Sequence, residues 1–275
     1  MRVHHINCGT ECPYGGHLFD GQTRGFGPSR LTCHCLLIEA GSELVLVDTG
    51  FGTRDVRDPP SRIPGFFRAM NNIRFDPQET AVAQIRRLGL QPADVRHIVL
   101  THLDFDHAGG LDDFPQATVH LFEPEARAAR ERRGPRARRR FRPQQWQDGG
   151  PWREYQVAGE RWFGFDAVRQ LDGLPPEILM VPLPGHTEGH CGVAVQGETG
   201  WKLLAGDAYF NHGEIDPAGR RCPSGARFYQ RMMEVDHARR MENQARLREL
   251  MRQHGREIDV FCSHDPADLD RHGAG

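Results

Sequence analysis

The sequence is short of lysine, of long apolar runs and of an N-terminal export signal. Lys202 is the single lysine, and the other 34 of the 35 basic residues are arginine, a bias typical of a GC-rich genome. No apolar run approaches the roughly 18 residues that a membrane helix needs, so we expect no membrane span. Residues 1–5 lack the apolar core of a signal peptide, and we therefore expect a cytoplasmic protein.

Charge and cysteine content are those of an ordinary soluble globular chain. The net charge is −2 and 38% of the residues are hydrophobic. Seven cysteines are an odd number, so at least one thiol is unpaired, and without an export signal we expect reduced thiols. A structural zinc site is an alternative for Cys8, Cys12, Cys33 and Cys35, but the Cys-x-Cys spacing of the last two fits it poorly. We interpret Cys33 and Cys35 as small apolar residues of a strand.

Turn and capping signals divide the chain into strands and helices. A capping box at Asp76 predicts a helix to Leu88, another helix is expected at 123–133, and Asp236 caps a long amphipathic helix that ends at Gly255. Residues 51–75 are expected to form a loop with one short helix. By themselves these signals establish only a mixed α/β class. Strands are expected at residues 2–7, 31–38, 44–47, 95–100, 117–121, 178–181, 192–196, 202–205 and 258–262.

Residues 101–110, Thr-His-Leu-Asp-Phe-Asp-His-Ala-Gly-Gly, carry the strongest chemical signal. Four metal-binding side chains, His102, Asp104, Asp106 and His107, fall within six positions, after an apolar run and before two glycines. This pattern predicts a strand that ends in a ligand-bearing loop. Imidazole and carboxylate groups together suit zinc, iron, manganese or cobalt. We therefore expect a metal-dependent hydrolase.

Five segments in order resemble the metallo-β-lactamase superfamily. The loop at 101–110 resembles the family's Thr-His-x-His-x-Asp-His-x-Gly-Gly signature, with Asp104 where the family usually has histidine. The other four are Val47-Asp48-Thr49-Gly50, the 184–190 segment with His186, Ala205-Gly206-Asp207 and Ser263-His264-Asp265. The resemblance implies an α/β fold of the αββα sandwich type, in one domain over residues 1–275.

The resemblance also implies a ligand set for two divalent metal ions. His102, Asp104 and His186 would bind the first ion, Asp106, His107 and His264 the second, and Asp207 would bridge both. Asp48 would orient a ligand. Asp104 remains compatible with a ligand role because its carboxylate oxygen lies as many bonds from Cβ as the histidine nitrogen that it replaces. Zinc is the expected metal, and iron and manganese are alternatives that an oxygen-richer first site favours.

The same resemblance implies a reaction and a branch. Length, the 101–110 loop and the Ser-His-Asp segment look most like the N-acyl homoserine lactone lactonases. A metal-activated water would attack a lactone or ester carbonyl, and Asp106 would give a proton to the leaving alkoxide. Tyr209 is a candidate to hydrogen-bond the carbonyl, although lactone-hydrolysing members have tyrosine one position later, and a packed aromatic is its alternative. We expect an uncharged or singly charged small-molecule substrate.

Two rival functions stay open at this point. Asp104 motivates an iron-dependent redox or sulfur-oxidising role, although no flavin domain is evident to feed electrons to such a centre. The other rival is a non-catalytic metal-binding regulator that keeps the fold with a weakened site. The other ligand positions are intact, which argues against decay.

An arginine- and tryptophan-rich segment is the least family-like part of the chain. Residues 127–142 hold nine arginines, and Trp146, Trp152 and Trp162 follow, so we assign an insertion at about 123–165. Basic clusters beside aromatic residues can bind nucleic acid. We favour a solvated helix and loop that packs onto acidic neighbours or caps the site, because the whole chain is not basic. The family resemblance implies that an insertion here lines the substrate pocket or forms a homodimer contact.

Overall fold

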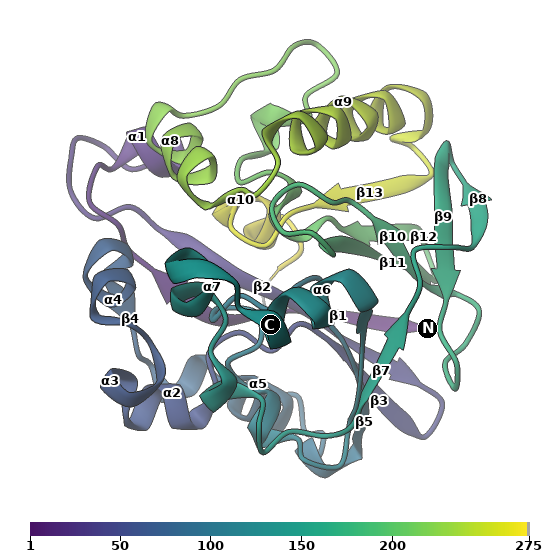
Figure 1. Ribbon diagram of the computed structural model, residues 1–275. Coiled ribbons are helices and arrows are strands. Elements are labelled where there is room, and N and C mark those ends of the chain that lie inside the picture. The colour runs from purple at the N-terminus through teal and green to yellow at the C-terminus, as the bar shows by residue number, and fades with distance from the viewer. Residues whose placement is uncertain (274–275) are drawn as a thin grey trace.

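Two mixed β-sheets lie face to face between outer helices in the computed structural model, which describes residues 1–273 (Figure 1). The first sheet has the strand order β4-β1-β2-β3-β5-β6-β7 and the second the order β13-β12-β11-β10-β9-β8. The strands are β1 (Arg2–Glu11), β2 (Leu31–Ala40), β3 (Glu43–Val47), β4 (Ile73–Arg74), β5 (Val95–Val99), β6 (Thr118–Phe122), β7 (Trp152–Tyr155), β8 (Glu160–Trp162), β9 (Phe165–Gln170), β10 (Ile178–Pro182), β11 (Cys191–Gly197), β12 (Gly200–Leu204) and β13 (Ile258–Phe261).

The buried core fills three layers between these elements. Leu36 and Ile38 of β2 pack against Val193 of β11, so one face of each sheet meets the other. Leu37 points the opposite way and packs in a cluster with Ile85 of the helix α5 (Ala81–Arg87). This alternation is the two-residue period of a strand whose two faces are both covered.

The outer face of the second sheet is covered in the same way. Leu203 of β12 packs with Leu247 and Leu250 of the long helix α9 (His237–His254), which lies across the top of Figure 1. Helices therefore cover both outer faces of two stacked sheets. The predicted αββα sandwich is confirmed.

Most of the remaining helices are short. The α-helices are α1 (His17–Asp20), α2 (Thr53–Arg57), α3 (Pro59–Arg62), α4 (Gly65–Asn71), α6 (Glu123–Glu131), α7 (Gly134–Arg140), α8 (Ser224–Met233) and α10 (Pro266–Asp270). The 3₁₀ turns are η1 (Pro77–Glu79), η2 (Pro92–Asp94), η3 (Leu111–Asp113), η4 (Pro143–Gln145), η5 (Gly206–Ala208) and η6 (His212–Glu214).

The predicted helix from Asp76 to Leu88 is wrong at its start. Asp76 caps only the turn η1, where its side chain accepts from the amide of Gln78 at 2.9 Å. Thr80 is extended, with φ −60° and ψ 146°, and its hydroxyl accepts from the amide of Ala83 at 3.3 Å to begin α5. Two successive capping residues thus split one predicted helix into a turn and a helix. Asp236, by contrast, caps α9 as predicted.

The strands predicted from apolar runs are all present, with ends shifted by a few residues. Strands β4, β7, β8 and β9 and helix α8 were not predicted, and three short helices replace the single one expected at 51–75. All seven cysteines are free thiols. Within residues 1–273, none of the helices combines the length and apolarity that crossing a membrane requires. The cytoplasmic location stays a prediction.

Candidate metal centre

Strand ends from both sheets meet at one edge of the sandwich. β3 and β5 are parallel neighbours, so Asp48 and the 101–110 loop emerge side by side. β12 and β13 are likewise parallel neighbours, and Asp207 and His264 follow them directly. His186 lies in the loop that leads into β11. Pairing of parallel strands therefore gathers polar residues that are more than 200 positions apart in the chain.

Six of the predicted ligands form two compact groups. Each group offers three buried donor atoms that lie within 4.8 Å of one another. The first group is His102, His186 and Asp207, and the second group is Asp106, His107 and His264.

Asp207 connects the two groups. Its Oδ2 lies 3.3 Å from Nε2 of His186, and its Oδ1 lies 3.2 Å from Nε2 of His107 and 3.0 Å from Nε2 of His264. One carboxylate thus faces both groups, as the predicted bridging role requires.

The chemistry of these atoms fits divalent metal ions. His102 Nε2, His107 Nε2 and Asp207 Oδ1 are buried without a hydrogen-bond partner among residues 1–273. Burying such atoms unpaired is costly, and a cation in the second group would compensate His107 Nε2 and Asp207 Oδ1. Imidazole nitrogen and carboxylate oxygen are the donors that zinc, iron and manganese accept.

Neighbouring residues fix the rings of the second group. His107 Nδ1 lies 2.9 Å from Oδ2 of Asp48, and His264 Nδ1 lies 2.8 Å from the carbonyl oxygen of Thr32. Each contact holds the proton on Nδ1 and leaves the Nε2 lone pair for a ligand bond. Asp48 also accepts from the amide of Thr101 at 2.8 Å. The predicted orienting role of Asp48 agrees with these contacts.

His190 positions Asp207 rather than joining the ligand groups. Its Nδ1 lies 2.8 Å from the carbonyl oxygen of Leu183, and its Nε2 accepts from the amide of Asp207 at 2.9 Å. Both ring nitrogens are therefore used. Gly109 has a related packing role in the ligand loop, because a Cβ there would lie 2.1 Å from Oδ2 of Asp55.

Asp104 has a partner that the sequence did not indicate. Both of its carboxylate oxygens accept from the guanidinium of Arg140, the last residue of α7, with Nη2 2.7 Å from Oδ2. The same Nη2 lies 2.6 Å from Nε2 of His186. Burial would raise the pKa of Asp104, but the charges of Arg140 and His102 hold it well below the usual range. Arg140 thus binds both oxygens that Asp104 would offer to a metal ion, and the ligand role of Asp104 stays a prediction.

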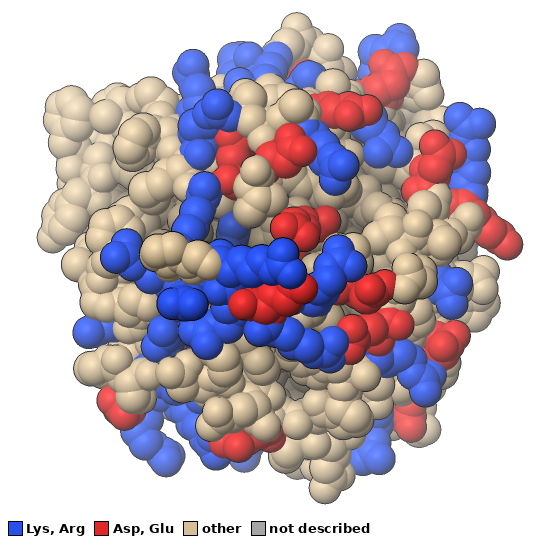
Figure 2. All heavy atoms as spheres, in the orientation of Figure 1, with Lys and Arg blue, Asp and Glu red and all other residues tan. Residues whose placement is uncertain are grey.

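Sequence reasoning missed Arg140 because it is one of nine arginines in a run of sixteen residues. Its neighbours in that run follow the solvated pattern: Arg130 pairs with Glu154 at 2.9 Å and Arg133 with Glu131 at 3.1 Å. Figure 2 shows these basic side chains gathered over α6 and α7, with acidic residues beside them. Only 3% of Arg140 is exposed, in contrast to its exposed neighbour Arg139.

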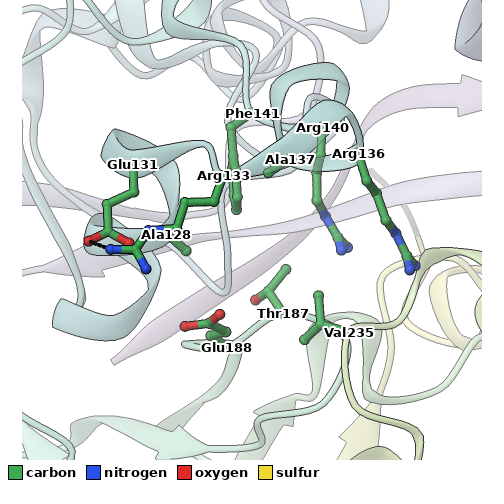
Figure 3. Close-up of a pocket in the computed structure, with 10 residues that line it drawn as sticks. All are labelled: Ala128, Glu131, Arg133, Arg136, Ala137, Arg140, Phe141, Thr187, Glu188 and Val235. Carbon is green, nitrogen blue, oxygen red and sulfur yellow. Dashed lines mark hydrogen bonds and ion pairs between the residues drawn. The ribbon is translucent and has the colours of Figure 1, made fainter.

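A pocket of about 200 Å³ lies beside the metal-binding groups (Figure 3). In Figure 3, Arg136 and Arg140 extend from α7 toward the loop that carries Thr187 and toward Val235. Arg136 donates to the carbonyl oxygen of Glu234 at 2.7 Å. Residues of the segment 123–165 therefore line this pocket, and the insertion and its predicted role at a substrate pocket stay predictions.

Tyr209 does not lie with the metal ligands. Its side chain is fully buried in the cluster beneath α9, and its hydroxyl donates to Asp268 at 3.4 Å. The residue one position later is Phe210, whose ring centroid lies 4.5 Å from that of His264. The predicted carbonyl contact of Tyr209 thus finds no support, because its hydroxyl is buried away from the ligands. Phe210, which does face the ligands, has no hydroxyl.

A different tyrosine approaches the site from α8. The ring of Tyr229 packs on Phe210, with centroids 5.7 Å apart, and its hydroxyl accepts from Nδ2 of Asn71 at 3.1 Å. Burial raises the pKa of Tyr229, and the nearby carboxylates Glu11 and Asp106 raise it further. Tyr229 can be identified only from the folded structure, since no motif surrounds it in the sequence.

Comparison with known proteins places the chain among metal-dependent hydrolases. Residues 28–264 match the family model described as the metallo-beta-lactamase superfamily. A probable metallo-hydrolase of Mycobacterium tuberculosis is 42% identical over 97% of this chain and 81% of its own length. The N-acyl homoserine lactonase AttM of Azorhizobium caulinodans is 32% identical over 48% of each chain.

A solved structure supports the fold independently. An N-acyl homoserine lactone hydrolase with N-hexanoyl-L-homoserine bound at its catalytic metal centre superposes with a TM-score of 0.72. The match covers 98% of this chain and 95% of that one, at 19% sequence identity. At this identity the likeness establishes the shared architecture.

Proposed function

Because this chain belongs to the metallo-β-lactamase superfamily and is a metal-dependent hydrolase, we propose that it hydrolyses a lactone or ester of a small molecule. Acyl-homoserine lactones are the first substrates to test, since AttM and the superposed hydrolase act on or bind such compounds. The observation that carries the proposal is the pair of buried acceptor atoms without partners on His107 and Asp207, within the described chain.

The chain's own residues hold and orient the reacting groups. Asp106, His107, His264 and Asp207 are proposed to bind divalent metal, with zinc preferred and iron or manganese as alternatives. When bound, such a metal supplies Lewis acidity, which makes a water molecule acidic and polarises a carbonyl. Asp48 keeps the ring of His107 in place through the 2.9 Å contact, so the ligand geometry does not depend on the substrate.

Asp106 is the proposed proton carrier. It is 7% exposed, against 2% for Asp104 and 3% for Asp207, so it is the most accessible of the three carboxylates. As the carboxylate most open to solvent, Asp106 can take a proton from water and give it to the leaving alkoxide.

Tyr229 is proposed to replace Tyr209 as the hydroxyl that contacts the substrate carbonyl. Tyr229 is 7% exposed and packs on Phe210, which contacts His264. Tyr209 has no exposed surface. The hydroxyl of Tyr229 accepts from Asn71, so its own proton remains free to donate to a carbonyl oxygen.

The test is a substrate screen joined to one substitution. Purified protein with bound metal would be assayed on lactones, aryl esters, thioesters, β-lactams and phosphodiesters. We expect turnover of lactones or esters, and loss of at least about a thousandfold in kcat/KM for Asp207→Ala, because it removes the carboxylate shared by both groups.

The matched control is Asp166→Ala, which removes an exposed carboxylate on β9 and should leave turnover unchanged. Turnover that survives Asp207→Ala, or a wild-type protein that hydrolyses none of these carbonyl compounds, would contradict the proposal.

A further inference from the structure

The guanidinium of Arg140 has no donor left for a substrate. Its Nε donates to Oδ1 of Asp104, and its Nη1 donates to the carbonyl oxygens of His186 at 3.1 Å and Met233 at 2.8 Å. Its Nη2 donates to Oδ2 of Asp104 at 2.7 Å and to Nε2 of His186 at 2.6 Å. A guanidinium has five N–H groups, so all of them are used. Arg140 is therefore a fixed positive charge held inside the first ligand group.

This arrangement occupies the ring nitrogen that a metal ion in the first group would need. Nε2 of His186 lies 2.6 Å from Nη2 of Arg140 and 2.9 Å from Oδ2 of Asp104, so the ion pair engages it whichever tautomer the ring adopts. Oδ2 of Asp104 lies 3.4 Å from Nε2 of His102 and would face the same ion, but it also accepts from Arg140. Two of the side chains that the resemblance assigns to the first ion are thus already bound to a cation.

Charge acts in the same direction. Arg140 already pairs with Asp104, one of the buried carboxylates of the site, so less negative charge is left in the first group for a metal ion to neutralise.

The second group has no such competitor. Asp106, His107 and His264 have no lysine or arginine within ion-pair distance anywhere in residues 1–273, and Nε2 of His107 has no hydrogen-bond partner there. All three side chains and Oδ1 of Asp207 remain available as ligands.

We propose that this protein holds one metal ion, bound by Asp106, His107, His264 and Asp207, and that the Asp104–Arg140 ion pair takes the place of the first ion. Asp104 and Arg140 then act as one unit, because a carboxylate can hold a guanidinium where an imidazole could not. The inference rests on the proposed function only in assuming that the site binds metal.

The direct test counts metal ions without measuring activity. Native mass spectrometry and elemental analysis at saturating zinc should give one ion per chain for the wild type. Arg140→Met should bind two, because His186 and Asp104 become free and the bare carboxylate needs a new cation. Arg139→Met is the matched control: it removes an exposed arginine of the same helix, and its count should stay at one.

A second variant guards against misfolding of Arg140→Met. The double substitution Asp104→His with Arg140→Met removes both buried charges together and restores the histidine pattern, so it should fold and bind two ions. Single alanine variants locate the ion in the otherwise native protein: His264→Ala should lose it, and His102→Ala should keep it.

A wild-type count of two, or a double variant that still binds only one ion, would overturn the inference. The same holds if His102→Ala loses the ion. These outcomes are separate from the proposed function, since a protein that binds one ion and hydrolyses no ester would refute the proposed substrate class and leave the count standing.

Discussion

The two ligand groups differ in which cations neutralise their carboxylates. In the first group, burial lowers the pKa of His102 and His186, and for His186 the charge of Arg140 lowers it further. In the second group, burial again opposes protonation, but Asp207 and Asp106 raise the pKa of His107 well above its usual value and that of His264 to about 9. Arginine neutralises the first group permanently, while the second group relies on cations that can be exchanged.

This difference predicts which of the two groups binds a metal ion more favourably. A metal ion in the second group would take the place of the protons that the nearby carboxylates favour on His107 and His264. An ion in the first group would instead have to displace a guanidinium with five hydrogen bonds. The structure therefore predicts measurable asymmetry between two groups whose ligand types look alike in the sequence.

The largest expected effect is on the stability of the metal-free protein as pH rises. The pKa of His264 in the folded protein, about 9, lies above the ordinary value of 6.5 because Asp207 and Asp106 outweigh the effect of burial. Its contribution is therefore fully present below pH 6.5 and lost as pH rises through 9, by about 3 kcal/mol at most. Glu11, whose pKa burial raises to about 8, acts in the same direction.

Urea unfolding of metal-free protein between pH 6.5 and 9.5 measures this dependence. His264→Gln should flatten the curve, whereas His102→Gln should not, because burial keeps His102 neutral throughout. Equal flattening by both variants would show that the two groups titrate alike and would break the comparison.

A smaller effect is expected at the residue that orients the second group. Asp48→Asn replaces the carboxylate that contacts Nδ1 of His107 at 2.9 Å. Loss of such an outer contact typically weakens metal affinity by about 10–100-fold. Competition against a chromogenic chelator measures the change, with Asp166→Asn as an exposed control. An unchanged affinity would mean that His107 does not bind the ion.

The smallest expected effects are those of Tyr209 and Tyr229, one on stability and the other on kcat. Tyr209→Phe breaks the hydroxyl contact with Asp268 and should cost about 1 kcal/mol of stability with kcat unchanged. Tyr229→Phe, beside the second group, should lower kcat for a lactone while changing KM little. Steady-state kinetics and thermal unfolding of both variants decide this. A loss of kcat in Tyr209→Phe alone would restore the interpretation first drawn from the sequence.

Sequence patterns alone predicted a mixed α/β class and most of its strands, and the family resemblance supplied the layers and the six ligands that the structure brings together. An apolar run that is followed by His, Asp and Gly, as before residues 101–110, is typical of a strand with polar groups at its end. Edge strands such as β7 and β8 lack such runs, because exposed positions interrupt them. The predicted helix at Asp76 failed because Thr80 starts a second cap.

Arg140 could not be identified as a buried site residue from the sequence pattern. Nothing in the segment 127–142 distinguishes a buried arginine from the exposed ones around it. The distinction depends on where the end of α7 meets the loop of His186 and the end of α8, which is a property of three-dimensional packing. For the same reason Tyr209 was preferred on its spacing from Asp207, although the strand end turns its ring into the core.

The contact between β2 and the loop after β13 has a consequence for assembly. Thr32 accepts from His264, and the amide of His34 donates to the carbonyl oxygen of Ser263 at 2.9 Å, so the beginning and the end of the chain close the site together. No fragment that lacks either end can complete the cluster. Metal uptake during refolding should therefore require that residues 32–34 and 263–264 have come together, and metal release should report their separation.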